Sequence, residues 1–440
     1  MTSTRRRFLA TAGTATTAAL AGCADLWSRE AEAPSFDADA LRAVAALPSP
    51  DLPEALPVPP AAEYRASARD HAETLLDAVP DPLTADDVPN EVVRDHVAGE
   101  REGARSALDS AADAATPTAA LGTLRTARCR AANAEATYAA ARDGRTREDA
   151  LAGREAVRST LDDLRGRLAH EGDDPVATLL TDATVEHYAR RAGEMLDRAT
   201  ETNESGALAV GEAAQRVEWA RSFAADGAHV RDRFAAAQTA PRAWDGRFAD
   251  VARALAADAR SRFDDIPDGY AEDPDGEFGR DIADTPAEDL VSEAYSGARY
   301  AVESLGDPAE RPASAALDGC RADRELRAFE RVREAVDDGA YDTPEGGAAV
   351  RTAKLDAVEA VERARAGDHL TRRVLSAAAF ELRGGDQCLV RYGEVQDDVG
   401  SVSWAVAYYG YATARAEAVP GAVARIEGLL RGERPRDPHD

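Results

Sequence analysis

The sequence is poor in several residue types, and each shortage narrows the choice of fold. Its 440 residues include one lysine, three isoleucines and two methionines, and only 5% of them are aromatic. No run alternates β-branched or aromatic residues with polar ones as a half-buried strand would. The sequence therefore predicts an all-α fold without a sheet, in which abundant alanine lets helices pack closely through small side chains.

Cysteine is also scarce, and its spacing argues against two kinds of stabilising site. Beyond Cys23 only Cys129, Cys320 and Cys388 remain. An odd number of cysteines without metal-ligand spacing is neither a disulfide framework nor a zinc site. Buried free thiols are the simplest interpretation, and the sequence leaves open whether any of the three forms a disulfide.

Acidic residues outnumber basic residues in the chain. Aspartate and glutamate total 81 against 53 lysines and arginines, which gives a formal net charge of −28. A surface this acidic repels nucleic acid and anionic lipid headgroups, so neither is expected as a direct ligand. At about 1 M salt the Debye length falls to about 3 Å, which screens the self-repulsion. The composition therefore fits a high-salt medium.

The first 23 residues have the parts of an export signal. Three consecutive arginines begin at Arg5, and no side chain from Ala10 to Ala24 is charged. Leu20 is the only large apolar residue in that uncharged stretch, whereas a membrane-spanning helix needs about 20 mostly apolar residues. Residues 1–22 are therefore expected to be a signal peptide and not a permanent membrane helix.

Two short motifs in this region carry a family resemblance. The order Thr4-Arg5-Arg6-Arg7-Phe8-Leu9 resembles the twin-arginine export signal, and Leu20-Ala21-Gly22-Cys23 is similar to a lipobox. In this order at the N-terminus, they resemble the exported lipoproteins of extremely halophilic archaea. The resemblance implies export through Arg5 and Arg6, a covalent lipid on Cys23, and anchoring on the extracytoplasmic face of the cell membrane.

Composition divides the rest of the chain into a spacer and two helical units. Six prolines between residues 48 and 60 favour extended backbone, so residues 23–60 are predicted to be an acidic spacer with one short helix near Asp37–Ala46. The first helical unit is expected at residues 61–238, the second at 239–432, and a polar tail at 433–440.

Helix starts are marked by a capping residue followed by proline, as in Thr116-Pro117 and Asp174-Pro175. Apolar residues then recur at three- and four-residue spacing. The expected helices lie near 61–78, 89–114, 117–142, 146–169, 175–200, 206–237, 241–264, 286–305, 312–338, 344–366, 368–391, 399–417 and 419–432.

The residues that begin and end helices also recur along the chain. The segments Pro117–Gly144 and Pro312–Gly339 lie 195 residues apart, and both begin with proline and end with Asp-Gly. Because caps and turns are fixed by backbone geometry, this correspondence predicts two similar units with the same helix order. The join is expected near Thr239–Pro241 as a short bend.

Histidine and carboxylate patterns give no recognisable metal centre. None of the seven histidines has a glutamate three residues before it, and the sequence His-Glu-x-x-His is absent, which argues against the ligand pattern of ferritin-like bundles. The loop 268–284 holds enough carboxylates for calcium but lacks the EF-hand order. We expect this loop to be solvated and predict no cofactor apart from the lipid on Cys23.

Three aromatic residues recur at helical spacing in a chain that is only 5% aromatic. Trp404, Tyr408 and Tyr411 are spaced i, i+4 and i+7, which puts them on one helix face. Such a face is either a ligand-binding wall or part of the core. No catalytic motif accompanies it, so these three are the candidate ligand-binding residues.

Two functional interpretations follow. The first is a lipid-anchored surface protein that acts as a binding or scaffold module for other envelope components. The alternative is an exported helical enzyme or metal-binding protein whose site assembles from scattered histidines and carboxylates. Convergence of two or more histidines with carboxylates in one pocket would favour the alternative.

Overall fold

The protein is built from helices joined by short loops. The computed structural model describes residues 36–201, 205–272, 274–392 and 399–433. The one strand pair among them joins β1 (Glu171–Gly172) to β2 (Arg242–Ala243) over two residues. The predicted all-α fold is therefore confirmed apart from this small ladder. Arg5, Arg6, Cys23 and most of the predicted tail lie outside the described residues.

The described residues of the first unit form seven helices. They are α2 (Ala62–Asp77), α3 (Glu91–Ala112), α4 (Pro117–Asp143), α5 (Arg147–Leu151), α6 (Arg154–Gly166), α7 (Pro175–Glu201) and α8 (Ala207–Ala236). At its centre, α4 packs against α2, α3 and α8, and α7 packs against α8 on the other side.

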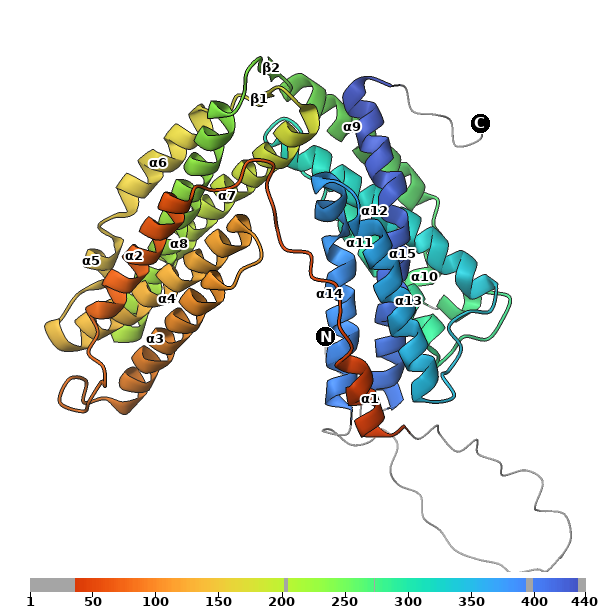
Figure 1. Cartoon of the computed structure of the whole chain (residues 1–440), viewed down its shortest axis with the longest axis horizontal. Helices are drawn as coiled ribbons and strands as arrows, with labels where there is room; N and C mark the ends of the chain where they lie inside the picture. Colours follow the sequence, from red (N-terminus) through yellow and green to blue (C-terminus); the bar gives the residue numbers. More distant parts are fainter. Residues whose placement is uncertain (1–35, 202–204, 273, 393–398, 434–440) are drawn as a thin grey trace, which may run out of the picture.

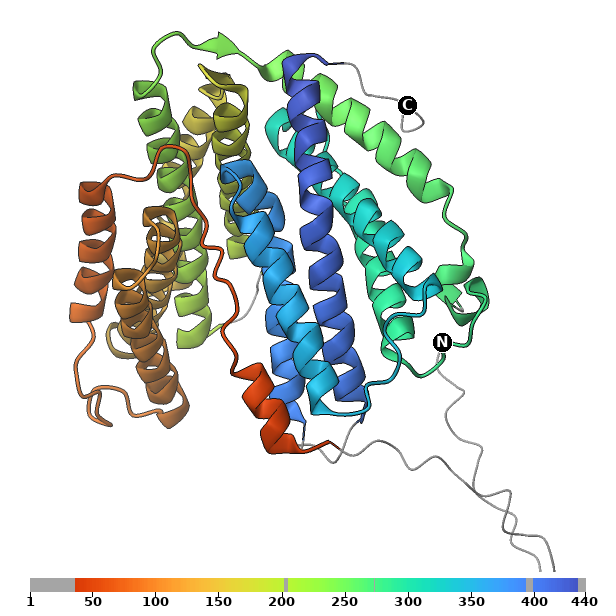
Figure 2. The same ribbon diagram turned by 45° about the vertical axis from the view of Figure 1, so that its right-hand side comes forward.

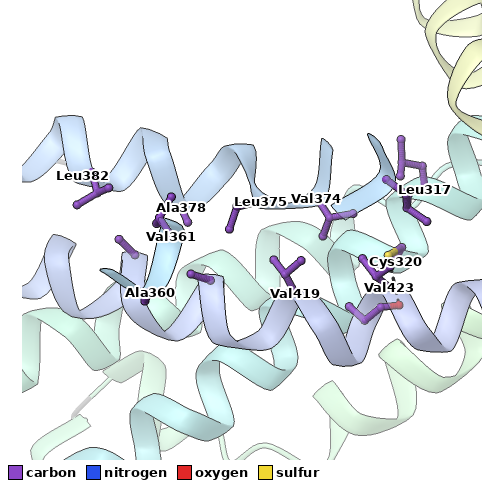
Figure 3. Close-up of a cluster of buried hydrophobic side chains, with 14 of the residues drawn as sticks. Leu317, Cys320, Ala360, Val361, Val374, Leu375, Ala378, Leu382, Val419 and Val423 are labelled. Atoms are coloured by element: carbon purple, nitrogen blue, oxygen red, sulfur yellow. Dashed lines mark hydrogen bonds between the residues drawn. The ribbon is translucent and has the colours of Figure 1, made fainter. Parts of the chain in front are cut away.

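The second unit follows β2 directly. It comprises α9 (Asp245–Asp264), α10 (Gly269–Glu272), the 3-10 turn η1 (Pro274–Glu277), α11 (Pro286–Glu303), α12 (Pro312–Asp337), α13 (Gly347–Arg365), α14 (His369–Arg391) and α15 (Val399–Arg431). Figure 3 shows its core, where small and branched side chains of α12, α13, α14 and α15 meet. None of the described helices in either unit is long and apolar enough to cross a membrane.

The main helices of the two units follow in the same order and pack in a similar pattern. The second unit has α10 and η1 in addition, and a single helix, α13, where the first has α5 and α6. In the first, α4 contacts α2, α3 and α8, and in the second, α12 contacts α9, α11 and α15. The pair α7 and α8 likewise corresponds to α14 and α15. Pro117 and Pro312 each begin the equivalent central helix, and Gly144 and Gly339 follow its end with φ values of 73° and 88°. The prediction of two similar tandem units is confirmed.

The units meet at one end and spread apart at the other, as the two sides of an inverted V (Figure 1). Figure 2 shows the connection through β2 at the joined end. The contact of α7 with α12 and α15, together with the β1–β2 ladder, joins them. We call this contact the unit interface. Its apolar part is continuous with the core of the second unit, because Leu179, Leu180 and Ala183 of α7 pack in the same cluster as Phe248 and Leu255.

Glu186 makes the central polar contact of the unit interface. Its buried carboxylate accepts hydrogen bonds from the backbone N–H groups of Ala313 (3.2 Å) and Ser314 (2.6 Å), in the first turn of α12. A third partner is the imidazole of His170, 2.8 Å away. The N-cap residue Arg311 makes no side-chain capping bond, so a residue of the first unit caps the central helix of the second.

Residues 36–60 do not form the free spacer that the prolines suggested. Helix α1 (Ala38–Ala45) buries Leu41 and Val44 against α13 and α14 of the second unit. The chain then runs up between the units to α2 of the first (Figure 1). The buried Lys354 binds the backbone oxygens of Ala45 and Leu47, both at 2.8 Å. Proline favours an extended backbone, and these contacts hold the extended backbone against the second unit. Residues 23–35 are outside the described residues.

Two helix boundaries also differ from expectation. The segments expected at 399–417 and 419–432 form one helix, α15, with Pro420 inside it. A proline removes one backbone hydrogen bond, but burial of Val419 and Ala422 holds the helix together on both sides of it. The segment expected at 146–169 is instead divided into α5 and α6 near Gly153.

Small residues set the helix spacing, as the composition suggested. Gly211 of α8 lies against α4, and a methyl group at this position would come within 3.0 Å of the backbone oxygen of Asn133 and closer still to the Thr137 hydroxyl. Gly122 of α4, by contrast, has open space at the same atom. Close packing of α4 on α8 therefore requires glycine at one position and tolerates alanine at the other.

We predict opposite effects for alanine at these two glycines. Gly211→Ala should lower the free energy of unfolding by about 1–3 kcal/mol, because overpacking forces the helices apart. Gly122→Ala should raise it by up to about 1 kcal/mol, because alanine is the better helix former. Denaturant unfolding of both variants checks this, and equal effects would show that α4 and α8 do not pack this closely.

Candidate functional site at the unit interface

A pocket of about 630 Å³ opens where α7 of the first unit meets α11, α12 and α15 of the second. We call it the interface pocket. Both units contribute to its wall, so neither unit alone would form it. The lining residues are Ala183, His187, Arg190, Gly297, Tyr300, Ala301, Ser304, Arg311, Ser314, Leu317, Asp318, Arg321, Arg324, Glu325 and Arg415.

Each helix presents one face to the pocket. From α7 come Ala183, His187 and Arg190, spaced i, i+4 and i+7. Helix α11 contributes Gly297, Tyr300 and Ala301, and its C-cap residue Ser304 follows with the same period. Gly297 leaves room for Tyr411 and Arg415 of α15, because a methyl group there would lie 2.0 Å from the Tyr411 hydroxyl.

A buried ionic network forms the floor of the pocket. Glu325 of α12 is only 3% exposed and accepts hydrogen bonds from the Tyr411 hydroxyl and from Nε of Arg415, both at 2.8 Å. Its other oxygen accepts from Arg324. Arg415 in turn donates to Glu381 of α14 and stacks on the Tyr411 ring at 3.9 Å. The network joins α12, α14 and α15.

The ionisation of this network is set by charge pairing. Burial opposes ionisation of Glu325, but the guanidinium groups of Arg324 and Arg415 outweigh it and lower the pKa of Glu325 to about 2. Burial has the opposite outcome at Glu381, whose pKa is raised because Arg415 does not fully compensate for lost hydration. Glu325 is therefore a fixed anion at neutral pH.

The structure separates the three aromatic residues predicted to form a ligand wall. Tyr411 is fully buried and belongs to the ionic network under the pocket. Trp404 is 37% exposed and packs beside Tyr408 with their ring centroids 5.9 Å apart. The residues share a helix, but α11 and α12 cover the end that carries Tyr411. The three side chains therefore do not form one exposed wall.

The described histidines make separate contacts, and no second histidine joins His187 in the interface pocket. His187 shares that pocket with Asp318 and Glu325, whereas His170 is hydrogen-bonded to Glu186. His71 contacts Glu218 at 3.2 Å, and His229 accepts the backbone N–H of Ala61. Within the described part of the chain, no three histidine, cysteine or acidic side chains are placed to hold a metal ion. The convergence that would favour the metal-binding alternative is not seen there.

The acidic loop 268–284 is held by one of its own carboxylates and by one from α11. Asp275 accepts the backbone N–H of Ile282 at 2.6 Å, and Glu288 accepts that of Asp284 at 2.7 Å. Asp273 is outside the described residues, so the expectation of a solvated loop without calcium remains a prediction from the sequence. The thiols of Cys129, Cys320 and Cys388 are free.

The arginines of the interface pocket were missed by sequence reasoning. Arg321 and Arg324 lie about one turn apart on α12, and Arg311 is its N-cap residue. These positions are visible in the sequence. Arginine supplies all but one of the chain's 53 basic residues, so a helical spacing of arginines was no signal in itself. Only the meeting of α7, α11 and α12 distinguishes these arginines from the rest.

We predict that Glu325 carries a pH-dependent part of the stability. Its folded pKa lies below the unfolded value, so its contribution is complete above about pH 4.5 and is lost as the pH falls toward 2. Glu325→Gln should cost about 3–5 kcal/mol near neutrality, because two buried guanidinium groups lose their anion. The difference from wild type should shrink between about pH 5 and 2.

Glu359→Gln is the matched control. Glu359 is exposed on α13 and pairs with Arg363 at 2.8 Å, so its loss should change stability by no more than about 1 kcal/mol. Unfolding curves at several pH values test both variants. A Glu325→Gln deficit that stayed constant with pH would contradict the assigned ionisation.

In the comparison with known proteins, each unit matches a different family model. Residues 63–241 match the model of a domain of unknown function (DUF8262), and residues 245–428 match that of another domain of unknown function (DUF8264). No curated protein and no solved structure matches the chain. The chain is thus similar to two families in tandem, with the border between them beside β2.

Proposed function

We propose that the protein is an exported, lipid-anchored binding protein of a high-salt cell envelope, and that its ligand occupies the interface pocket. The observation that carries the binding part is the pocket itself, because its wall is assembled from both units. Ligand pockets of about 300–1,000 Å³ are typical of small-molecule sites, and they occur preferentially between domains.

Support for the location comes from the sequence. The twin-arginine motif around Arg5 and Arg6 and the lipobox ending at Cys23 are the basis for export and anchoring. Descent of the two units from one ancestral unit is a further part of the proposal, supported by their equal helix order and packing. The pocket would then have arisen at the contact between copies, where neither copy alone had a site.

Anchoring is tested by removing the lipid-accepting sulfur. In cells expressing the full chain, Cys23→Ala should move the protein from the membrane fraction to the medium or the soluble fraction. Replacing Arg5 and Arg6 by lysine should instead leave it inside the cell. Immunoblots of fractionated cells, with a membrane and a cytoplasmic marker, give the readout.

Cys388→Ala is the control, because Cys388 is a half-buried free thiol of the body. This variant should remain in the membrane fraction like the wild type. A Cys23→Ala protein that stays with the membrane would overturn the lipid anchor. Export of the double-lysine variant would overturn the twin-arginine route and leave the anchor untouched.

A further inference from the structure

The interface pocket is rich in positive charge, although the whole protein has a net charge of −28. Two carboxylates line it, Asp318 and Glu325. Five arginines line it as well, namely Arg190, Arg311, Arg321, Arg324 and Arg415. A concentration of one sign in a concave site focuses the electrostatic potential and favours ligands of the opposite sign.

The two carboxylates are already engaged by arginine. Glu325 is shared by Arg324 and Arg415, and Asp318 accepts from Arg321 at 2.9 Å. Arg311 makes no ion pair or side-chain hydrogen bond with the described residues. Its guanidinium group is therefore available to a ligand at the mouth of the pocket.

Arg324 has an unused donor in the wall of the pocket. Its guanidinium group is 6% exposed, and its terminal nitrogens donate to Glu325 and to the backbone oxygen of Val374. The buried Nε has no hydrogen-bond partner. A buried unsatisfied donor costs about 1–3 kcal/mol, and an acceptor oxygen in the pocket would remove that cost.

Burial and neighbouring positive charge lower the pKa values of two groups in the pocket. Burial and the guanidinium groups of Arg373 and Arg324 lower the pKa of Arg321 despite its contact with Asp318. Burial and the neighbouring Arg190, Arg373 and Arg191 lower the pKa of His187 to about 4. His187 is therefore neutral at pH 7. Arg190 and Arg415 are paired with Glu194 and Glu381. The excess of positive charge in the pocket therefore comes from Arg311, Arg321 and Arg324, which outnumber Asp318 and Glu325.

We propose that the interface pocket binds a small organic oxyanion, a phosphate monoester or a polycarboxylate, through Arg311, Arg321 and Arg324. The planar guanidinium fork matches the paired oxygens of both groups, which share the chemistry that recognises them. The volume of about 630 Å³ exceeds the need of the charged group alone, so the rest of the ligand lies against Ala301 and Tyr300. This inference rests on the proposed binding function and adds the class of ligand.

The test measures binding of four probes by calorimetry. Glycerol 3-phosphate and citrate represent the two sources of the oxyanion, and glycerol and xylitol are their uncharged counterparts. Sodium chloride at about 1 M shortens the Debye length to about 3 Å and suppresses diffuse attraction. The full mature chain is compared with Arg311→Gln, Arg321→Gln, Ala301→Trp and Arg253→Gln. Arg253 is an exposed residue of α9 that pairs with Asp250.

At least one anionic probe should bind the wild type, and the neutral probes should not. Arg311→Gln and Arg321→Gln should each weaken binding by about tenfold or more, because each loses a charge-assisted contact. Ala301→Trp should abolish binding by filling the pocket, and Arg253→Gln should have no effect. Melting temperatures verify that the variants fold, and Arg311→Gln is the decisive one because Arg311 has no partner to lose.

The imidazole of His187 supplies a readout independent of affinity. An anion beside it offsets the neighbouring guanidinium groups, so the anionic probe should raise the pKa of His187 measured by NMR. Binding of a neutral probe that Ala301→Trp blocks, without anion binding, would overturn the oxyanion class and retain the pocket. Failure of all four probes would overturn the oxyanion class and remove the support for the pocket as a ligand site.

Discussion

The buried carboxylate of Glu186 fixes the relation between the two units. It takes the place of an N-cap for α12, because it accepts the N–H groups of Ala313 and Ser314 from across the unit interface. Helix α12 is the central helix of the second unit, so α9, α11 and α15 are placed relative to the first unit through it. A negative charge at a helix N-terminus is favourable. Here the carboxylate also links the two units across a buried interface.

The interface pocket is a consequence of this contact. Arg321 and Arg324 of α12 line the pocket that opens at this contact. Glu325 neutralises part of their charge and ties α12 to α15 through Arg415. Hydrogen bonds to Glu325 and to the backbone oxygen of Val374 hold Arg324 in the buried wall. This pre-organisation is what would allow an acidic protein to bind an anion.

Much of the fold was predictable because it depends on local chemistry. Thr116 caps α4 through the N–H of Ala119, and Pro117 occupies the first helical position, as the sequence indicated. The matching helix order of the two units was visible from the recurrence of Pro312 and Gly339. Pro420 was misleading because packing on both sides of a proline outweighs the hydrogen bond that it removes.

The site was much less predictable, because its residues become meaningful only in three dimensions. Trp404, Tyr408 and Tyr411 have the correct helical spacing, yet neighbouring helices cover Tyr411 and leave Trp404 at the surface. No local pattern shows that Glu186 meets Ala313, which lies 127 residues further along the chain. The same holds for Lys354, whose contacts with Ala45 and Leu47 turn an expected spacer into part of the folded body.

The unit interface should make one cooperative folded body from the two similar units. Calorimetric unfolding of the mature chain in high salt measures this, because cooperativity reports whether the units unfold together. We expect a single transition whose calorimetric and van't Hoff enthalpies agree. Two separate transitions, each with the enthalpy of one unit, would contradict it.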